Sequence, residues 1–255
     1  MPRIPHGRLR GGCKPLCLSC QRCFSQACVV RLSRSHVPTQ PTRMDSLTAE
    51  LTANAADPLL DWNLADATPA ATWDLVASEL VAAAASGRHP LHLPTLTTVS
   101  PDGWPQSRTV VLRLFDPAHR EAWFHTDVRS GKVTDMLREP RVALHWYDPS
   151  ARLQIRIAAR AHVHHCDARA RTAWGNSAAM SRACYAAGDA PGTPLEQFPT
   201  APPHPTDGDD AGFEVFTAVC CHFDTVDLLA LHAAGHQRVV LNLKGRQPTW
   251  QILAP

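Results

Sequence analysis

The sequence predicts a mainly β protein with a few helices, folded as an antiparallel Greek-key barrel. Apolar residues recur with a period of two through most of the chain after Leu91, which is typical of strands. The predicted strands follow one another through short turns, and helices are only inserted between them. No Gly-x-Gly motif occurs, so the fingerprint of a doubly wound dinucleotide-binding fold is missing.

The first 43 residues differ in composition from the rest of the chain. They hold eight basic residues and no Asp or Glu, which gives them a charge of +8, whereas the remaining residues (17 basic, 23 acidic) carry −6. We expect residues 1–43 to be a basic, cysteine-rich leader. Either it is a disordered tail, or translation begins at Met44 and the start codon of the sequence was assigned too far upstream. Residues 44–255 are then the folded domain.

Two other interpretations of the leader stay open. Its Arg-rich, acid-free composition resembles a transit peptide, although Pro and Gly interrupt any amphipathic repeat. Its cysteines at positions 17, 20 and 23 have a spacing that is used for iron–sulfur or zinc ligation. The cysteine pattern is not followed by the hydrophobic pattern that a small metal-binding fold would need.

One helix is predicted before the strands begin. Thr68 can cap it and Pro69 suits its first position. Apolar residues then follow with a spacing near 3.6, up to Gly87: Trp73, Val76, Leu80 and Val81.

The strands are predicted in two runs. The first run comprises Leu93–Val99, Gln106–Phe115, Glu121–Thr126, Arg141–Tyr147 and Arg152–His164, with short helices at Ser130–Arg138 and Asp167–Ala179. The second comprises Phe213–Val219, Phe223–Leu231, Val239–Lys244 and Thr249–Leu253. Between the runs, residues 186–212 contain six prolines and several glycines, which predicts a long irregular loop.

Composition excludes several classes of protein. Outside the leader the longest apolar run is Leu80–Ala85, far short of the roughly 20 residues that a membrane span needs. Four scattered cysteines imply no disulfide framework, so we expect a soluble protein of a reducing compartment, the cytoplasm. The net negative charge after residue 43 argues against a nucleic-acid partner.

Anion-binding groups gather where one strand leads into a helix. The segment Phe124–Lys132 offers the hydroxyls of Thr126 and Ser130, free backbone N–H groups and the ammonium of Lys132 at a helix N-terminus. The chain has only three lysines but 22 arginines, so a lysine at position 132 is not simply what the overall composition would put there. These features predict a phosphate site; the alternative is that Lys132 only solvates a short helix.

Two other strands carry cationic or amide side chains. In Gln106–Phe115, alternation places Arg108 and Val110 on one face and Arg113 on the other. In Arg152–His164, Gln154 and Arg156 share the face opposite Leu153, Ile155 and Ile157. The polar face of this strand could equally face solvent.

The order and spacing of these segments resemble the pyridoxamine 5′-phosphate oxidase-related, FMN-binding split-barrel superfamily. The resemblance covers Leu91–Pro255, including the closing Trp250–Pro255. It implies a split barrel that dimerises, with one FMN in each of two clefts at the subunit interface. The positions that match the FMN-binding residues of the family are Arg108, Val110, Arg113, His125, Thr126, Ser130, Lys132 and Gln154.

The chain departs from the family at several positions. Gly131 replaces an arginine that grips phosphate, and Arg113 stands where lysine is usual, near the flavin ring. The motifs by which pyridoxamine 5′-phosphate oxidases hold the phosphate of their vitamin substrate are mostly missing here, which indicates a different, unidentified small-molecule substrate. Ser181, Arg182 and Tyr185 are the residues expected to line its pocket.

The resemblance therefore predicts an FMN-dependent oxidoreductase in which Arg113 has the catalytic role of stabilising negative charge on the reduced flavin. The alternative function is a non-catalytic flavin-binding or haem-binding module, such as a sensor. No metal site is predicted. The cluster His162, His164, His165 and Cys166 could suggest one, but alternation along the strand points His165 away from His162 and His164, so solvated surface is favoured.

Overall fold

The computed structural model describes residues 59, 62–186, 188–198 and 210–255. The predicted leader, the predicted start of the domain at Met44, and the centre of the predicted loop (187 and 199–209) lie outside the described residues. The chain divides into the units Met1–Thr52 and Ala53–Pro255, and all elements below belong to the second unit. None of the helices in the described part is long and apolar enough to cross a membrane.

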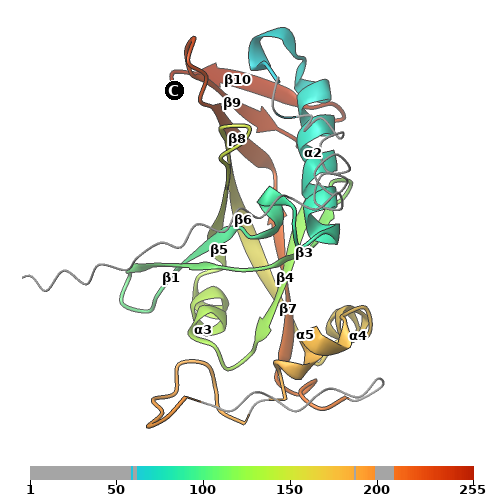
Figure 1. Ribbon diagram of the computed structural model, residues 1–255, viewed down its shortest axis with the longest axis vertical. Helices are drawn as coiled ribbons and strands as arrows, with labels where there is room; N and C mark the ends of the chain where they lie inside the picture. Colours follow the sequence, from blue (N-terminus) through green and yellow to red (C-terminus); the bar gives the residue numbers. More distant parts are fainter. Residues whose placement is uncertain (1–58, 60–61, 187, 199–209) are drawn as a thin grey trace, which may run out of the picture. The chain divides into compact units, whose positions relative to one another are not determined.

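Ten strands form one antiparallel sheet in the described residues (Figure 1). They are β1 Thr95–Val99, β2 Pro105–Thr109, β3 Leu112–Asp116, β4 Glu121–Asp127, β5 Arg141–Asp148, β6 Leu153–His165, β7 Phe216–Phe223, β8 Thr225–Ala230, β9 Gln237–Asn242 and β10 Thr249–Leu253. The helices are α2 Pro69–Ala85, α3 Gly131–Arg138, α4 Ala168–Gly175 and α5 Ala179–Ala183, with short 3₁₀ turns at Leu64–Asp66 and Pro90–His92.

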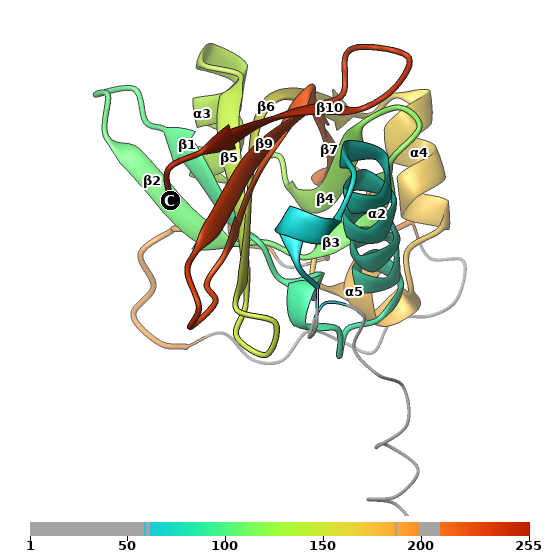
Figure 2. The same ribbon diagram turned by 90° about the horizontal axis from the view of Figure 1, so that it is seen from above.

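The long strand β6 is the point where the sheet divides. Leu153–Arg156 pair with β8, whereas Ala159–His165 pair with β7, and the other edge of β6 pairs with β5. One path runs β10-β9-β8-β6-β5-β1-β2, and the other leads from β7 through β4 to β3. The two ends of the sheet do not pair with each other in the described residues, which gives the open, split barrel seen in Figure 2. The predicted fold class is confirmed.

Alternating burial builds the core inside this sheet. In β5, every second residue from Val142 to Asp148 is buried, and β6 alternates in the same way from Leu153. Helix α2 packs on β3 and buries Val76 and Leu80, while Thr68 Oγ1 accepts the N–H of Ala71 at 3.2 Å. The predicted first helix is therefore confirmed together with its cap.

The predicted strand Gln106–Phe115 is wrong as a single strand. The chain leaves β1 after Thr109, where the N–H of Val110 donates to Pro94 O at 2.9 Å, and a register shift between Leu112 and Leu114 follows in the pairing of β3 with β4. Arg108 and Arg113 thus lie in different strands with different neighbours. Alternation was read correctly from the residues, but it cannot reveal where a chain changes partner strands.

Two other elements differ from the prediction by more than two residues, and the remaining boundaries differ by two residues at most. The helix expected over Asp167–Ala179 is two helices, because Ala178 is extended (φ −60°, ψ 145°) and separates α4 from α5. Strand β7 begins at Phe216 rather than Phe213, since residues 211–215 form turns. Gly212 is needed there: its φ is +92°, and a Cβ would lie 2.5 Å from the carbonyl carbon of Tyr185.

Candidate functional site

Four of the predicted cofactor residues meet at the junction of β4 and α3, and we call Arg108, Thr126, Ser130 and Lys132 the cationic cradle. Lys132 Nζ donates to Thr126 Oγ1 at 3.0 Å, and Thr126 Oγ1 lies 3.3 Å from Ser130 Oγ. Thr126 belongs to the end of β4, while Ser130 and Lys132 open α3. The tight connection from strand to helix therefore brings two hydroxyls and an ammonium together.

The start of α3 is not capped by its own N-cap side chain. Ser130 occupies the N-cap position, but its Oγ donates to Asp127 O at 2.7 Å and makes no bond to the helix N–H groups. The first N–H groups of a helix have no partner within the helix, and they carry partial positive charge. A Cβ added at Gly131 would meet nothing within 4 Å, so the space beside the helix start is open.

Arg108 approaches the same place from β2. Its Nη1 donates to Thr98 Oγ1 at 2.6 Å and to Gln106 O at 2.9 Å, and its Nη2 lies 3.8 Å from Asp135 Oδ2. Asp135 is a buried residue of α3 that also accepts the hydroxyl of Thr98 at 2.7 Å. These contacts fix the direction of the guanidinium before any ligand arrives.

The cradle holds its cations at an energetic cost. Burial lowers the pKa of Lys132, and the nearby charge of Arg108 lowers it further, against a smaller opposing effect of Asp127 and Asp135. Burial also lowers the pKa of Arg108, which Asp135 partly offsets. An anion placed between Arg108 and Lys132 would relieve this repulsion, so the arrangement suits a phosphate group.

A second group of predicted residues lies on the other face of β4. His125 Nδ1 is 3.4 Å from Ser177 Oγ, and the His125 ring packs edge-on against Phe216. Burial, with a further contribution from Arg113, lowers the pKa of His125 to about 4, so the imidazole is neutral at pH 7. Arg113 reaches Ser181 Oγ at 3.5 Å.

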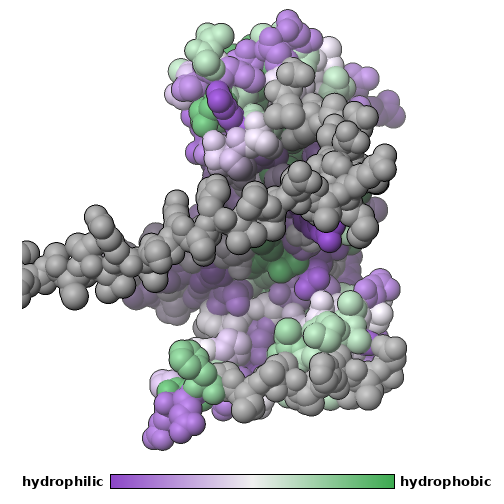
Figure 3. All heavy atoms as spheres, in the orientation of Figure 1, coloured by the Kyte–Doolittle hydropathy of each residue, from purple (hydrophilic) through white to green (hydrophobic). Residues whose placement is uncertain are grey.

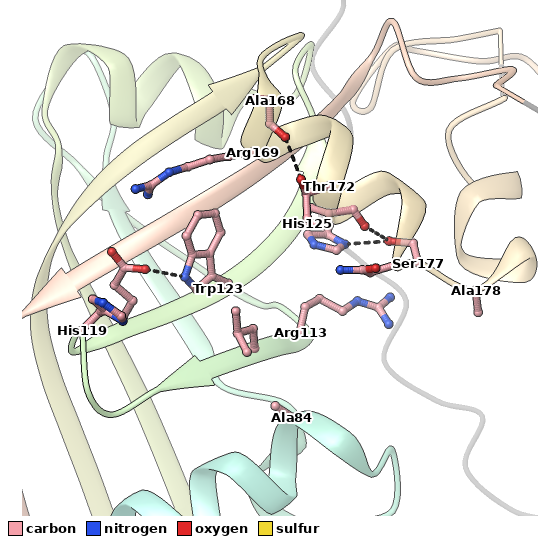
Figure 4. Close-up of a pocket in the computed structure, with 14 residues that line it drawn as sticks. Ala84, Arg113, His119, Trp123, His125, Ala168, Arg169, Thr172, Ser177 and Ala178 are labelled. Atoms are coloured by element: carbon pink, nitrogen blue, oxygen red, sulfur yellow. Dashed lines mark hydrogen bonds between the residues drawn. The ribbon is translucent and has the colours of Figure 1, made fainter.

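This second group opens onto a cavity of about 760 Å³ between β3, β4 and α4 (Figure 4). Its walls are Ala84, Arg113, Leu114, His119, Glu121, Trp123, His125, Ala168, Arg169, Thr172, Ala173, Asn176, Ser177 and Ala178. In Figure 3, hydrophobic residues (green) gather over α4 and α5 on a face that is elsewhere mostly hydrophilic. A concave site that combines apolar and a few polar groups is the usual form of a small-molecule site.

The structure places the predicted substrate residues beside this cavity rather than in its wall. Ser181 contacts Arg113, whereas the Arg182 guanidinium lies 5.7 Å from the centre of the Trp174 ring. Tyr185 packs edge-on against Trp174 and Phe216, and burial raises its pKa to about 12. Arg182 and Tyr185 thus pack on the small aromatic cluster around Trp174 that lies behind the cavity, whereas Ser181 contacts the cavity residue Arg113.

Two further predicted cofactor residues lie away from the cradle. Val110 is buried in the core beside β3. Gln154 lies on β6, where it pairs with Tyr147 of β5 and Leu229 of β8. Three residues further along β6, Ile157 is aligned across the sheet with Leu144, Leu96 and Arg108, so the side chains of these four residues share one face. Because side chains alternate along a strand, Gln154 and Arg108 lie on opposite faces of the sheet.

Two histidines at the end of β6 make local contacts through Nδ1, while the buried Nε2 of His164 has no hydrogen-bond partner in the described residues. His164 Nδ1 lies 2.8 Å from Asp167 Oδ2, and His165 Nδ1 lies 3.0 Å from Phe216 O. The Sγ of Cys166 is 3.3 Å from His165 Nε2. Within the described residues, no group of three or more His, Cys, Asp or Glu side chains could hold a metal ion.

Sequence reasoning missed Trp123, Arg169 and Asp135. Trp123 stands two residues before His125, so period-two alternation could have placed both on one face of β4. Arg169 and Asp135 had no such signal, because their positions depend on how α4 and α3 pack against strands that are distant in the sequence.

Comparison with known proteins agrees with this geometry. Residues 70–165 match the family model of the pyridoxamine 5′-phosphate oxidase, FMN-binding domain. A pyridoxine/pyridoxamine 5′-phosphate oxidase of Microcystis aeruginosa is 35% identical over 106 residues, which cover 40% of this chain and 49% of that protein. The chain thus matches about half the length of this curated relative.

Two solved structures share the fold. A pyridoxamine 5′-phosphate oxidase-related, FMN-binding protein of Nostoc punctiforme has a TM-score of 0.58 at 23% identity, covering 72% of this chain and 97% of its own. PhzG from Burkholderia lata, solved with tetrahydrophenazine-1-carboxylic acid, has a TM-score of 0.56 at 17% identity, covering 76% and 97%. Residues 70–165 thus match the model of the pyridoxamine 5′-phosphate oxidase FMN-binding domain, and the described domain shares the split-barrel fold of these two solved structures.

Proposed function

We propose that this protein is an FMN-dependent oxidoreductase that holds the FMN phosphate in the cationic cradle and acts on a small molecule. The observation that carries the proposal is the pairing of Arg108 with Lys132 around two hydroxyls at an uncapped helix start. Burial lowers the pKa of both cations, and the charge of Arg108 lowers that of Lys132 further, so two buried like charges lie close together in the cradle. Such an arrangement is unfavourable alone and favourable around a dianion.

The donor set fits a phosphate monoester. Arg108 and Lys132 supply two charges, Thr126 and Ser130 supply hydroxyls, and the start of α3 supplies backbone N–H groups. Charge-assisted hydrogen bonds of this kind contribute roughly 1.5–3 kcal/mol each. The open space beside Gly131 leaves room for the phosphate to approach the helix.

FMN, when bound, would supply two-electron transfer, and the chain would supply position and charge. Arg113 lies on the other face of β4 from the cradle, next to the cavity and to neutral His125. A cation there would stabilise negative charge on the reduced ring, and because His125 is neutral at pH 7, Arg113 is the member of this pair that carries the charge. The cavity then receives the small molecule that exchanges electrons.

We extend the proposal to a homodimer with FMN at the interface. Gln154 lies on the opposite face of the sheet from Arg108, and Arg113 lies on the opposite face of β4 from the cradle. A second copy would therefore have to supply part of this donor set if all of it contacts the same cofactor. The family resemblance supports this arrangement. The cysteines of the described residues are all free, which favours a reducing compartment such as the cytoplasm.

Spectroscopy and turnover test the proposal together. The purified protein should show flavin absorbance, or acquire it on addition of FMN, and the bound flavin should be reduced by a nicotinamide cofactor and reoxidised by oxygen or an organic acceptor faster than free FMN is. Flavin binding without turnover for every reductant and acceptor would favour the non-catalytic module instead. A Soret band with no flavin would overturn FMN in favour of haem.

A further inference from the structure

Arg108 of the cationic cradle is held by one end of its guanidinium. Nη1 carries two N–H groups, of which one donates to Thr98 Oγ1 at 2.6 Å and the other to Gln106 O at 2.9 Å. In the described part of the chain, neither Nε nor Nη2 donates a hydrogen bond, and Asp135 Oδ2, at 3.8 Å from Nη2, is beyond hydrogen-bonding distance. The Nε–Nη2 edge is therefore the side of the guanidinium that remains for a ligand.

Thr98 holds the guanidinium from inside the barrel. It is fully buried in β1 and lies diagonally across from Arg108 of β2, whose direct partner in the register is Leu96. The Thr98 hydroxyl donates to Asp135 Oδ2 at 2.7 Å and accepts from Arg108 Nη1. A hydroxyl has a single O–H group, so donating it to the carboxylate turns the lone pairs of Oγ1 toward the guanidinium.

Asp135 is placed by the helix that begins at the cradle. It follows Lys132 by three residues on α3, so the two side chains are neighbours on the helix surface. Helix α3 packs against β1, and Asp135 is buried there. The hydrogen bonds from Asp135 through Thr98 to Arg108 thus join the two cations of the cradle into one fixed unit.

The free edge of Arg108 suits a phosphate group. Nε and Nη2 present two parallel N–H groups, which match two oxygens of one phosphate, whereas the ammonium of a lysine acts as a point charge. A long side chain that is already held in one conformation has little freedom left to lose when a ligand binds. The contacts of Nη1 therefore prepare the opposite edge for a bidentate contact.

We infer that Thr98 is a positioning residue for the cofactor phosphate: it holds Arg108 so that Nε and Nη2 together receive two phosphate oxygens. The inference rests on the proposed function, because the cationic cradle is where the FMN phosphate is proposed to bind. Thr98 does not touch the ligand and acts only through Arg108.

Variants of the full-length apo-protein test the inference. Thr98→Val keeps the volume of the side chain and removes the hydroxyl, Thr98→Ala is a second variant without it, and Thr98→Ser retains it. Arg108→Lys keeps the charge and removes the fork of N–H groups. Thr97→Val is the matched control, because the Thr97 hydroxyl lies on the other face of β1, 2.8 Å from Ser107 Oγ. The melting temperature and the dissociation constants of FMN and riboflavin are measured for each protein.

Thr98→Val should bind FMN about tenfold more weakly, as expected for the loss of one charge-assisted hydrogen bond, and should bind riboflavin like the parent. Thr98→Ser and Thr97→Val should bind both flavins like the parent. Arg108→Lys should weaken FMN by at least as much as Thr98→Val does. Adding Thr98→Val to Arg108→Lys should cause no further loss, because Thr98 acts only through the fork.

An unchanged FMN affinity in Thr98→Val, an equal weakening of FMN and riboflavin, or losses that add in the double variant would each overturn the inference. If Thr98→Val does not fold, Thr98→Ala takes its place in both comparisons. An Arg108→Lys protein that binds FMN like the parent would show that the fork is not used. A parent protein that binds FMN no more tightly than riboflavin, or binds neither, would instead contradict the proposed function.

Discussion

His125 and Thr126 are neighbours in the sequence, and their side chains lie on opposite faces of β4. Thr126 accepts a hydrogen bond from Lys132 in the cationic cradle, while His125 contacts Ser177 at the cavity. One strand thus separates the proposed phosphate site from the proposed site of chemistry. A change on either side of β4 should affect cofactor binding and reactivity independently.

Replacing Lys132 with Met should weaken the binding of FMN and raise the stability of the apo-protein. Burial and Arg108 lower the pKa of Lys132, so its charged form opposes folding at every pH below its lowered pKa, and that cost disappears as the pH rises toward 10.5. Loss of the charge should raise the FMN dissociation constant roughly 10- to 100-fold. Titration with FMN and thermal unfolding of the apo-protein measure the two effects.

Lys244→Met is the control for that variant, because Lys244 is an exposed lysine that only faces Asp224 at 3.7 Å. It should change neither the FMN affinity nor the melting temperature by much. A Lys132→Met protein that melts earlier and binds FMN as tightly as the parent would show that Lys132 is a structural residue.

Gly131→Arg should tighten FMN binding. The space beside Gly131 is open, so the new side chain can reach the phosphate without displacing a neighbour. Gly131→Ala is the matched control, since it shares the gain in helix propensity, up to about 1 kcal/mol, without the charge. The account predicts a lower dissociation constant for Arg than for Ala; equal constants would mean that the phosphate lies elsewhere.

The free energy of unfolding should fall as the pH drops below 6.5, and part of this fall should come from His125. Its pKa is about 4 in the folded state against 6.5 in the unfolded state, because of burial and then of Arg113. Below pH 6.5 the unfolded chain binds a proton that the folded chain does not, so stability is lost as the pH falls from 6.5 toward 4, by up to about 3 kcal/mol.

Chemical denaturation of His125→Gln at a series of pH values measures this contribution. The variant should lose less stability than the parent between pH 6.5 and 4. His236→Gln, at an exposed histidine, should follow the parent curve. If His125→Gln also follows it, the imidazole is not held neutral by its surroundings.

Arg113→Ala should lower the midpoint potential of the bound flavin and slow its reduction. The potential should fall by about 30 mV for each 1.4 kcal/mol of lost stabilisation of the reduced ring. The pKa of His125 should rise at the same time, because Arg113 is one of the causes that lower it. Redox titration and NMR titration check the two effects; a variant that binds FMN and keeps the parent potential and rates would exclude the proposed role.

The local sequence predicted the elements whose signals are local. Thr68 and Pro69 predict the start of α2, and Ser130 predicts the start of α3. Alternation of apolar residues in Arg141–Tyr147 and Arg152–His164 predicts the ends of β5 and β6 to within a residue or two. The cradle was predictable for the same reason, because Thr126, Ser130 and Lys132 lie within seven residues of one another.

Features that depend on distant packing could not be predicted in this way. Arg108 and Arg113 fall in different strands because the chain changes from β1 to β4 as its neighbour, which no local pattern records. Arg169 enters the cavity wall only because α4 packs beside β7, and β7 pairs with β4. The separation of Gln154 from Arg108 likewise emerges only from the register of four strands.

Titration of the apo-protein with FMN and with riboflavin tests whether the cationic cradle holds the FMN phosphate, because the two ligands differ only in that phosphate. With Arg108, Lys132 and the start of α3 as donors, FMN should bind at least 100-fold more tightly than riboflavin, as expected for two charge-assisted hydrogen bonds. Equal affinities for the two flavins, or binding of neither, would contradict the account.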